Sequence, residues 1–70
     1  MTYQEWQILD YVQAGMYARH KNWRAGQALF NALYLVKHNL ADQIRAKDLD
    51  PFHDNAKIKP LTEWLYEQVK

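Results

Sequence analysis

The 70-residue chain contains no cysteine and no serine, and Thr2 and Thr62 are its only threonines. The absence of cysteine excludes disulfides and thiolate zinc sites. We assign Thr2 to a helix cap and Thr62 to the first turn of a helix, which leaves no candidate hydroxyl or thiol nucleophile. The three histidines lie 18 and 15 residues apart, without the i, i+4 spacing of a two-histidine metal site. The sequence therefore predicts a protein that is not an enzyme and uses no metal or cofactor.

The net charge is small, and long hydrophobic runs are absent from the sequence. The formal net charge is +1, which argues against nucleic-acid binding by bulk electrostatics. No stretch approaches the ~18 consecutive apolar residues of a membrane span, and the first residues lack the cationic and apolar regions of a signal peptide. We expect a single domain over residues 1–70, in the cytoplasm of its host cell and without contact with a membrane.

The chain is instead rich in aromatic and apolar side chains. Hydrophobic residues make up 49% of it, and three tryptophans, five tyrosines and two phenylalanines are present. This composition is typical of a folded domain. A chain this short buries only about 60% of its unfolded surface, so its stability must come from efficient aromatic packing or from a partner.

Hydrophobic periodicity and capping signals predict an all-α fold, a small bundle of three main helices plus one short helix. Thr2 and Glu5 form a capping box at the first helix, and Asn22 and Asn39 are the expected N-caps of the second and third. We expect Ile8 to face inward with the other aliphatic residues of the first helix. The predicted elements are an antiparallel hairpin of residues 3–20 and 23–37, a short helix at 40–46, an Asp-Pro-Phe turn at 50–52 and a last helix at 60–69 that begins with Pro60.

The second helix is too apolar for an ordinary surface helix. At ~100° per residue, its apolar side chains cover an arc roughly 200° wide, so more than one neighbour must cover it. Gly26 lies on this arc and predicts the close approach of a neighbouring helix. The predicted core is Leu33, Leu29, Phe30, Ile44 and Trp64.

A protein-binding surface is the leading functional hypothesis. Tyr3, Tyr11 and Tyr17 lie off the expected inward face of the first helix, and aromatic residues are enriched at interfaces. A strip of polar and aromatic residues follows one edge of the second helix. The candidate binding residues on this edge are Trp23, Gln27, Asn31 and Tyr34.

Two alternatives remain open. Arg19, Lys21 and Arg24 surround Trp23, a pattern that can hold phosphates while the indole stacks on a base, which would suit a nucleic-acid-associated accessory protein. The same aromatic surfaces could instead support a self-associating structural or regulatory domain, for example a homodimer. The acids between Asp48 and Asp54 fail the calcium-loop pattern, because His53 stands where glycine is needed, and we interpret them as turn and cap residues.

A longer pattern resembles a family. It consists of Trp23-Arg24-x-Gly26-Gln27-x-x-Phe30-Asn31-Ala32-Leu33, then Leu40-Ala41-Asp42-x-Ile44-Arg45, then Asp50-Pro51-Phe52-x-Asp54 with Ile58 following. This pattern resembles a group of small helical proteins of phages and bacterial genomes from which no activity can be transferred. The resemblance implies a phage or mobile-element context. In that context we expect a stoichiometric inhibitor or adaptor that binds a host or defence protein.

Overall fold

The computed structural model describes residues 1–69, and every regular element within that range is a helix. The all-α prediction is confirmed, but the division into three main helices and one short helix holds only roughly. The third helix has nine residues and the last has ten. In chain order the elements are α1 (Tyr3–Arg19), α2 (Ala25–Val36), α3 (His38–Ala46), the 3₁₀ turn η1 (Asn55–Lys57) and α4 (Ile58–Glu67).

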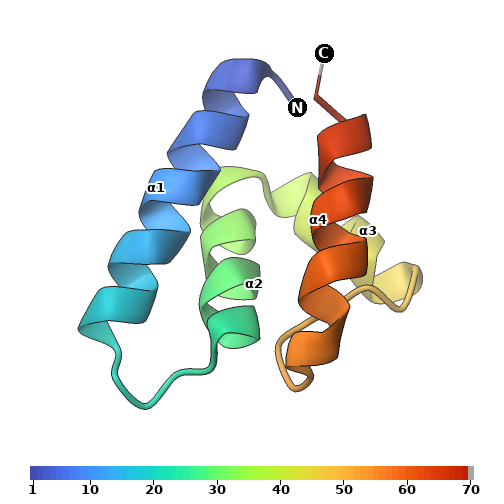
Figure 1. Ribbon diagram of the computed structural model, residues 1–70. Helices are drawn as coiled ribbons and strands as arrows, with labels where there is room; N and C mark the ends of the chain where they lie inside the picture. The colour runs from blue at the N-terminus through green and yellow to red at the C-terminus, as the bar shows by residue number, and fades with distance from the viewer. Residues whose placement is uncertain (70) are drawn as a thin grey trace.

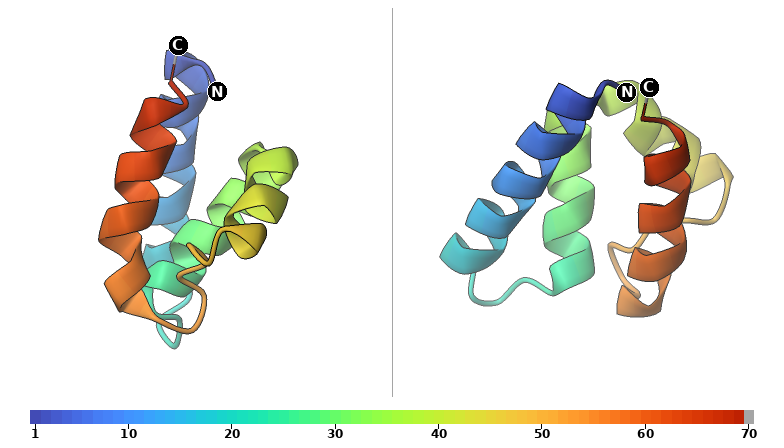
Figure 2. Two further views of the ribbon diagram at one scale, coloured as in Figure 1. Left: turned by 90° about the vertical axis from the view of Figure 1, so that its right-hand side faces the viewer. Right: turned by 45° about the horizontal axis from the view of Figure 1, so that its top comes forward.

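Helix α2 lies in the middle of the fold (Figure 1). It packs against α1, α3 and η1, as its wide apolar arc predicts. Helices α1 and α2 run antiparallel, so the predicted hairpin is confirmed. Helices α1 and α4 lie on one side of the molecule, and α3 lies on the other (Figure 2).

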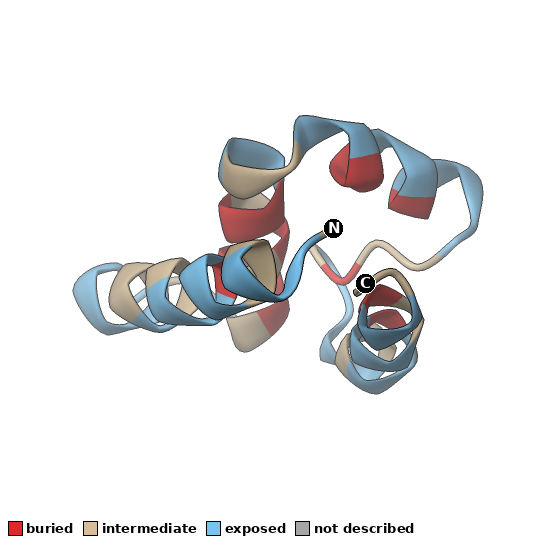
Figure 3. Cartoon of the chain, turned by 90° about the horizontal axis from the view of Figure 1, so that it is seen from above, coloured by how far each residue is buried: buried red, intermediate tan, exposed pale blue. Residues whose placement is uncertain are grey.

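The core draws on all four helices (Figure 3). Leu33 and Ile44 are fully buried and Phe30 is almost so, which confirms three of the five predicted core residues. Leu29 and Trp64 are only half-buried and pack against the edge of the core. The buried cluster consists of Leu9, Phe30, Ala32, Leu33, Leu40, Ala41, Ile44, Leu61 and Leu65.

Helix α1 begins as predicted but presents an unexpected face. The Thr2 hydroxyl accepts the Glu5 N–H at 3.1 Å, and the Glu5 carboxylate accepts the Thr2 N–H at 2.8 Å, which completes the capping box. Leu9 is the one buried residue of this helix. The expectation that Ile8 faces inward is wrong: its side chain is 52% exposed. A single helix of the fold packs closely along α1, so only one narrow face of it is covered.

The predicted N-cap of α2 is wrong. Asn22 lies in a turn in which the Trp23 N–H donates to the His20 carbonyl at 2.9 Å, and the helix starts only at Ala25. The residue at the N-cap position makes no side-chain capping bond. Asn55 takes over this function from 29 residues away, since its Oδ1 accepts the Gly26 N–H at 2.9 Å.

Asn39 is likewise not the N-cap of α3. The helix starts at His38, directly after the single non-helical residue Lys37, whose carbonyl accepts the N–H of Leu40 at 3.0 Å. At its other end Asp48 adopts a left-handed backbone, with φ of 58°. The Leu49 N–H then donates to the Ile44 carbonyl at 2.9 Å, the bond that marks a Schellman motif.

Helix α4 begins two residues before the prediction. Pro60 lies in its first turn but not at its first position, because Ile58 and Lys59 already belong to the helix. Its inward face is formed by the buried residues Leu61 and Leu65. No helix within residues 1–69 has the length and apolar character needed to cross a membrane.

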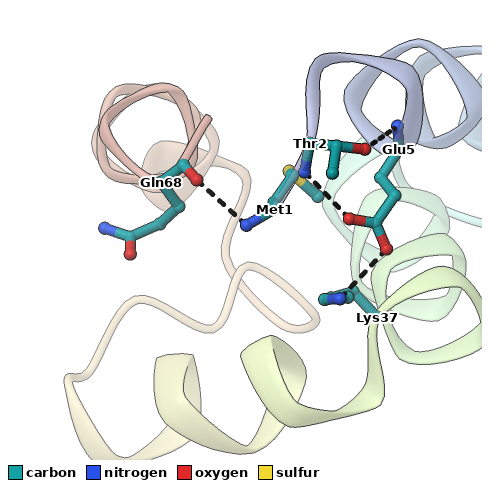
Figure 4. Close-up of polar contacts among 5 residues, drawn as sticks. All are labelled: Met1, Thr2, Glu5, Lys37 and Gln68. Atoms are coloured by element: carbon teal, nitrogen blue, oxygen red, sulfur yellow. Dashed lines mark hydrogen bonds and ion pairs between the residues drawn. The ribbon is translucent and has the colours of Figure 1, made fainter. Parts of the chain in front are cut away.

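Polar contacts join the start of α1 to its neighbours (Figure 4). The Met1 ammonium donates to the Gln68 carbonyl at 3.0 Å, which holds the beginning of α1 against the end of α4. Glu5 also pairs with Lys37 at 3.0 Å, across to the junction of α2 and α3. The Thr2 backbone N–H and then the Lys37 ammonium lower the pKa of the Glu5 carboxyl.

Candidate protein-binding hollow

An open hollow lies between the outer edge of α2, the end of α3 and the turn that follows it. Its volume is about 410 Å³. It combines aromatic rings with a cation, an anion and an amide. We call it the aromatic hollow; its lining residues are Phe30, Asn31, Tyr34, Arg45, Asp50, Phe52 and His53.

A guanidinium group that stacks on a buried ring lines the hollow. The Arg45 guanidinium carbon lies 4.9 Å from the centroid of the Phe30 ring, within the range of a cation–π contact. Phe52 meets Phe30 edge to face at 5.8 Å, and Tyr34 lies 6.3 Å from Phe30. Within residues 1–69, Arg45 forms no salt bridge, so its donors are available to a ligand. The hollow can therefore accept an anionic group beside an apolar one.

The turn that forms one wall is fastened to the start of α2. The Asp50 carboxylate accepts the Phe52 N–H at 2.9 Å and so fixes the turn itself. Arg24 donates from its guanidinium to the Phe52 carbonyl at 3.0 Å. A Cβ atom on Gly26 would lie 2.1 Å from the Pro51 carbonyl oxygen. The close approach predicted at Gly26 is real, but a turn makes it rather than a helix.

The structure separates the predicted binding residues of the second helix. Asn31 and Tyr34 line the aromatic hollow, and Tyr34 is exposed. Gln27 is half-buried on the same helix but is not part of the lining. Trp23 lies in the loop before α2, where its half-buried indole stacks on the His20 ring with centroids 3.9 Å apart.

The three tyrosines of the first helix are all exposed, but they do not form one stripe. At 100° per residue, Tyr11 lies about 80° from Tyr3 and about 120° from Tyr17 around the helix axis. Tyr11 is the most exposed, at 82%. The tyrosines therefore belong to two faces of α1, and the structure brings none of them to the aromatic hollow.

Of the three cations that could bind a phosphate backbone, Arg19 and Lys21 are exposed, whereas Arg24 is hydrogen-bonded within the fold. Arg19 ends α1 and Lys21 lies in the loop, both exposed. The Arg24 guanidinium is hydrogen-bonded to the Phe52 carbonyl in the turn after α3. One face of the Trp23 ring is already covered by His20, which leaves a single face for a base.

Several residues that now stand out were missed by sequence reasoning. Arg45, Asp50, Phe52 and His53 complete the aromatic hollow, yet no local periodicity joins them to Asn31 and Tyr34. A signal was available, since the first three belong to the pattern that carries the family resemblance. Leu35 was missed as well: it is 69% exposed on α2.

Comparison with known proteins adds no assignment. No protein family, curated protein or solved structure matches the chain significantly. The resemblance to phage-type helical proteins therefore stays a prediction. Within residues 1–69, no group of three His, Cys, Asp or Glu side chains is arranged to hold a metal ion.

Proposed function

We propose that this protein is a non-enzymatic binding module that acts stoichiometrically on another protein, with the aromatic hollow as its docking site. One observation carries the proposal: the Arg45 guanidinium, which forms no salt bridge within residues 1–69, stacks on the buried Phe30 ring, with the exposed Tyr34 beside it. Arginine and tyrosine are the residue types that most often dominate the binding energy of protein interfaces. The host or defence identity of the partner is proposed on the resemblance alone. A cytoplasmic location is proposed as part of the same hypothesis.

The chemistry of the hollow favours a particular kind of partner segment. A carboxylate can bind Arg45 through two parallel hydrogen bonds, and stacking on Phe30 holds the guanidinium ready for it. The Tyr34 and Phe52 rings offer apolar contact next to that position. The segment we expect therefore presents an acidic side chain beside an apolar or aromatic one.

Affinity capture with matched variants tests this proposal. Tagged wild type is compared with Arg45→Ala and with the control Lys47→Ala, which removes a cation from the end of the same helix but lies outside the hollow lining. We expect wild type and Lys47→Ala to recover equal amounts of the same partner protein. Arg45→Ala should recover at least about tenfold less of it, because a charge-assisted contact is lost. Equal recovery by all three would contradict the proposal.

A gel-retardation assay with the same wild-type protein tests the nucleic-acid alternative. We expect no retardation of single- or double-stranded DNA probes at low salt, because few cations are free. Retardation that disappears when Arg19, Lys21 and Arg24 are all changed to Ala would favour nucleic-acid binding instead.

A further inference from the structure

The aromatic hollow contains two opposite charges that do not pair with each other. Among its lining residues, Arg45 is the one arginine or lysine and Asp50 is the one acid. Within residues 1–69, no salt bridge joins Arg45 to Asp50, although both line the same hollow. A ligand in the hollow can therefore contact a separate cation and a separate anion.

Separate contacts hold the two charges in place. The Arg45 guanidinium lies over the Phe30 ring, 4.9 Å from its centroid. The Asp50 carboxylate accepts the Phe52 N–H at 2.9 Å, which is the bond of an Asx turn. One carboxylate oxygen makes this bond, and the carboxylate retains acceptor sites for a ligand. Because both charges are positioned before a ligand arrives, less ordering is needed on binding.

The turn that carries Asp50 is closed at its base by an ion pair. The Lys57 ammonium donates to the Asp48 carbonyl at 2.9 Å and pairs with the Asp48 carboxylate at 2.7 Å. These contacts join the two ends of the segment that contains Asp50 and Phe52. To pair with Arg45 directly, Asp50 would have to give up its bond to the Phe52 N–H, so the two charges stay apart in the free protein.

We propose that the aromatic hollow selects a dipolar peptide segment, with an acidic and a basic side chain on either side of an apolar or aromatic one. This inference rests on the proposed function and adds the charge pattern of the partner segment. The acidic group binds Arg45, the apolar group contacts the Tyr34 and Phe52 rings, and the basic group lies against Asp50. Complementary charges of this kind give an interface its specificity.

The two charges favour a dipolar segment over the other classes of occupant. A nucleic acid or a phosphorylated segment would be attracted by Arg45 but repelled by Asp50, because the Coulomb energy changes sign with the charge. An apolar segment would remove water from both charges and leave them without a partner, which costs free energy. A dipolar segment alone gains at both positions.

Blocked tripeptides test the charge pattern in the isolated protein. Acetylated and amidated Glu-Phe-Lys and Lys-Phe-Glu carry both charges in the two possible orders. The order that binds more tightly is compared with the same peptide in which glutamine replaces lysine. NMR titration of isotope-labelled protein, with peptide up to about 10 mM, measures both dissociation constants. We expect the amide signals of Asn31, Tyr34 and Phe52 to shift, and the lysine peptide to bind about threefold more tightly, as an exposed ion pair predicts.

Asp50 and Asp54 provide a matched pair of variants. Each accepts the backbone N–H two residues further on, Phe52 or Ala56, at 2.9 Å, and asparagine keeps that acceptor. Only Asp50 lines the hollow. Asp50→Asn should therefore bind the lysine and glutamine peptides equally, whereas Asp54→Asn should keep the preference of about threefold. Thermal melts check that both variants remain folded.

Four results would overturn the proposal: no binding of either peptide, equal binding of both by wild type, a lysine preference that persists in Asp50→Asn, or its loss from both asparagine variants. Affinity capture with Arg45→Ala does not involve these peptides, so the proposed function is tested separately. A partner that Arg45→Ala loses, together with equal binding of the two peptides by wild type, would support docking in the hollow and refute the dipolar pattern.

Discussion

Substituting alanine for Gly26 should destabilise the protein, because the added methyl group clashes with the turn after α3. The added Cβ would lie 2.1 Å from the Pro51 carbonyl oxygen and 3.0 Å from Asn55 Oδ1. Because the first contact is with backbone, the turn must move by about 1 Å, and strain of this kind costs about 1–3 kcal/mol. The same movement weakens the hydrogen bond from the Gly26 N–H to Asn55, worth about 1 kcal/mol. Alanine recovers about 1 kcal/mol through its helix propensity.

The net loss is therefore about 2 kcal/mol, which lowers Tm by about 8–16 °C in a domain of this size. Thermal unfolding followed by circular dichroism measures this change in Tm. Gly15→Ala is the matched control: its added methyl group meets no backbone, so Tm should rise by about 4–8 °C. A Gly26→Ala variant as stable as wild type would refute the reasoning, because it would show that the turn does not approach α2 closely.

Three further predictions concern the core, the long-range cap and the ion pair of α1. Leu33→Ala should cost about 2–5 kcal/mol, enough to unfold most of the chain, as a urea titration would show; a midpoint unchanged from wild type would contradict its central place in the core. Asn55→Ala should cost about 1 kcal/mol, whereas Asn55→Asp keeps the acceptor for Gly26 and should retain stability; equal melts for the two variants would argue against the cap. Because its folded-state pKa is lowered, Glu5 stabilises the protein above its ordinary value near 4.5, and this contribution is lost as the pH falls through the lowered pKa. Melts of wild type and Glu5→Gln should therefore differ at pH 7 and converge in acid, and a constant difference would exclude the ion pair with Lys37.

Local signals in the sequence were enough to predict much of the fold. The capping box at Thr2 and the apolar arc around Leu33 depend on residues within one or two turns of each other, and both are present. The helix start predicted at Asn22 was wrong for a different reason. The start of α2 is capped by Asn55, a contact between residues 29 positions apart, which no local rule can detect.

The candidate site was predicted in part for the same physical reason. Asn31 and Tyr34 were found because they follow the exposed edge of one helix. Arg45 reaches the same place because α3 packs against α2, and Phe52 does so because the turn after α3 folds back onto α2 at Gly26. Ile8 was placed inside because its helix was assumed to be covered along its whole apolar surface.

Site-specific photo-crosslinking tests the proposed function most directly. A photoreactive phenylalanine analogue replaces Tyr34 in the aromatic hollow or, as a control, Tyr66, which is exposed on α4 and outside the hollow lining. After irradiation in cells that carry the gene, we expect one discrete crosslinked partner from position 34, none from position 66, and loss of the product when Arg45→Ala is added. Identical products from both positions, or a product from position 34 that persists with Arg45→Ala, would contradict docking in the hollow.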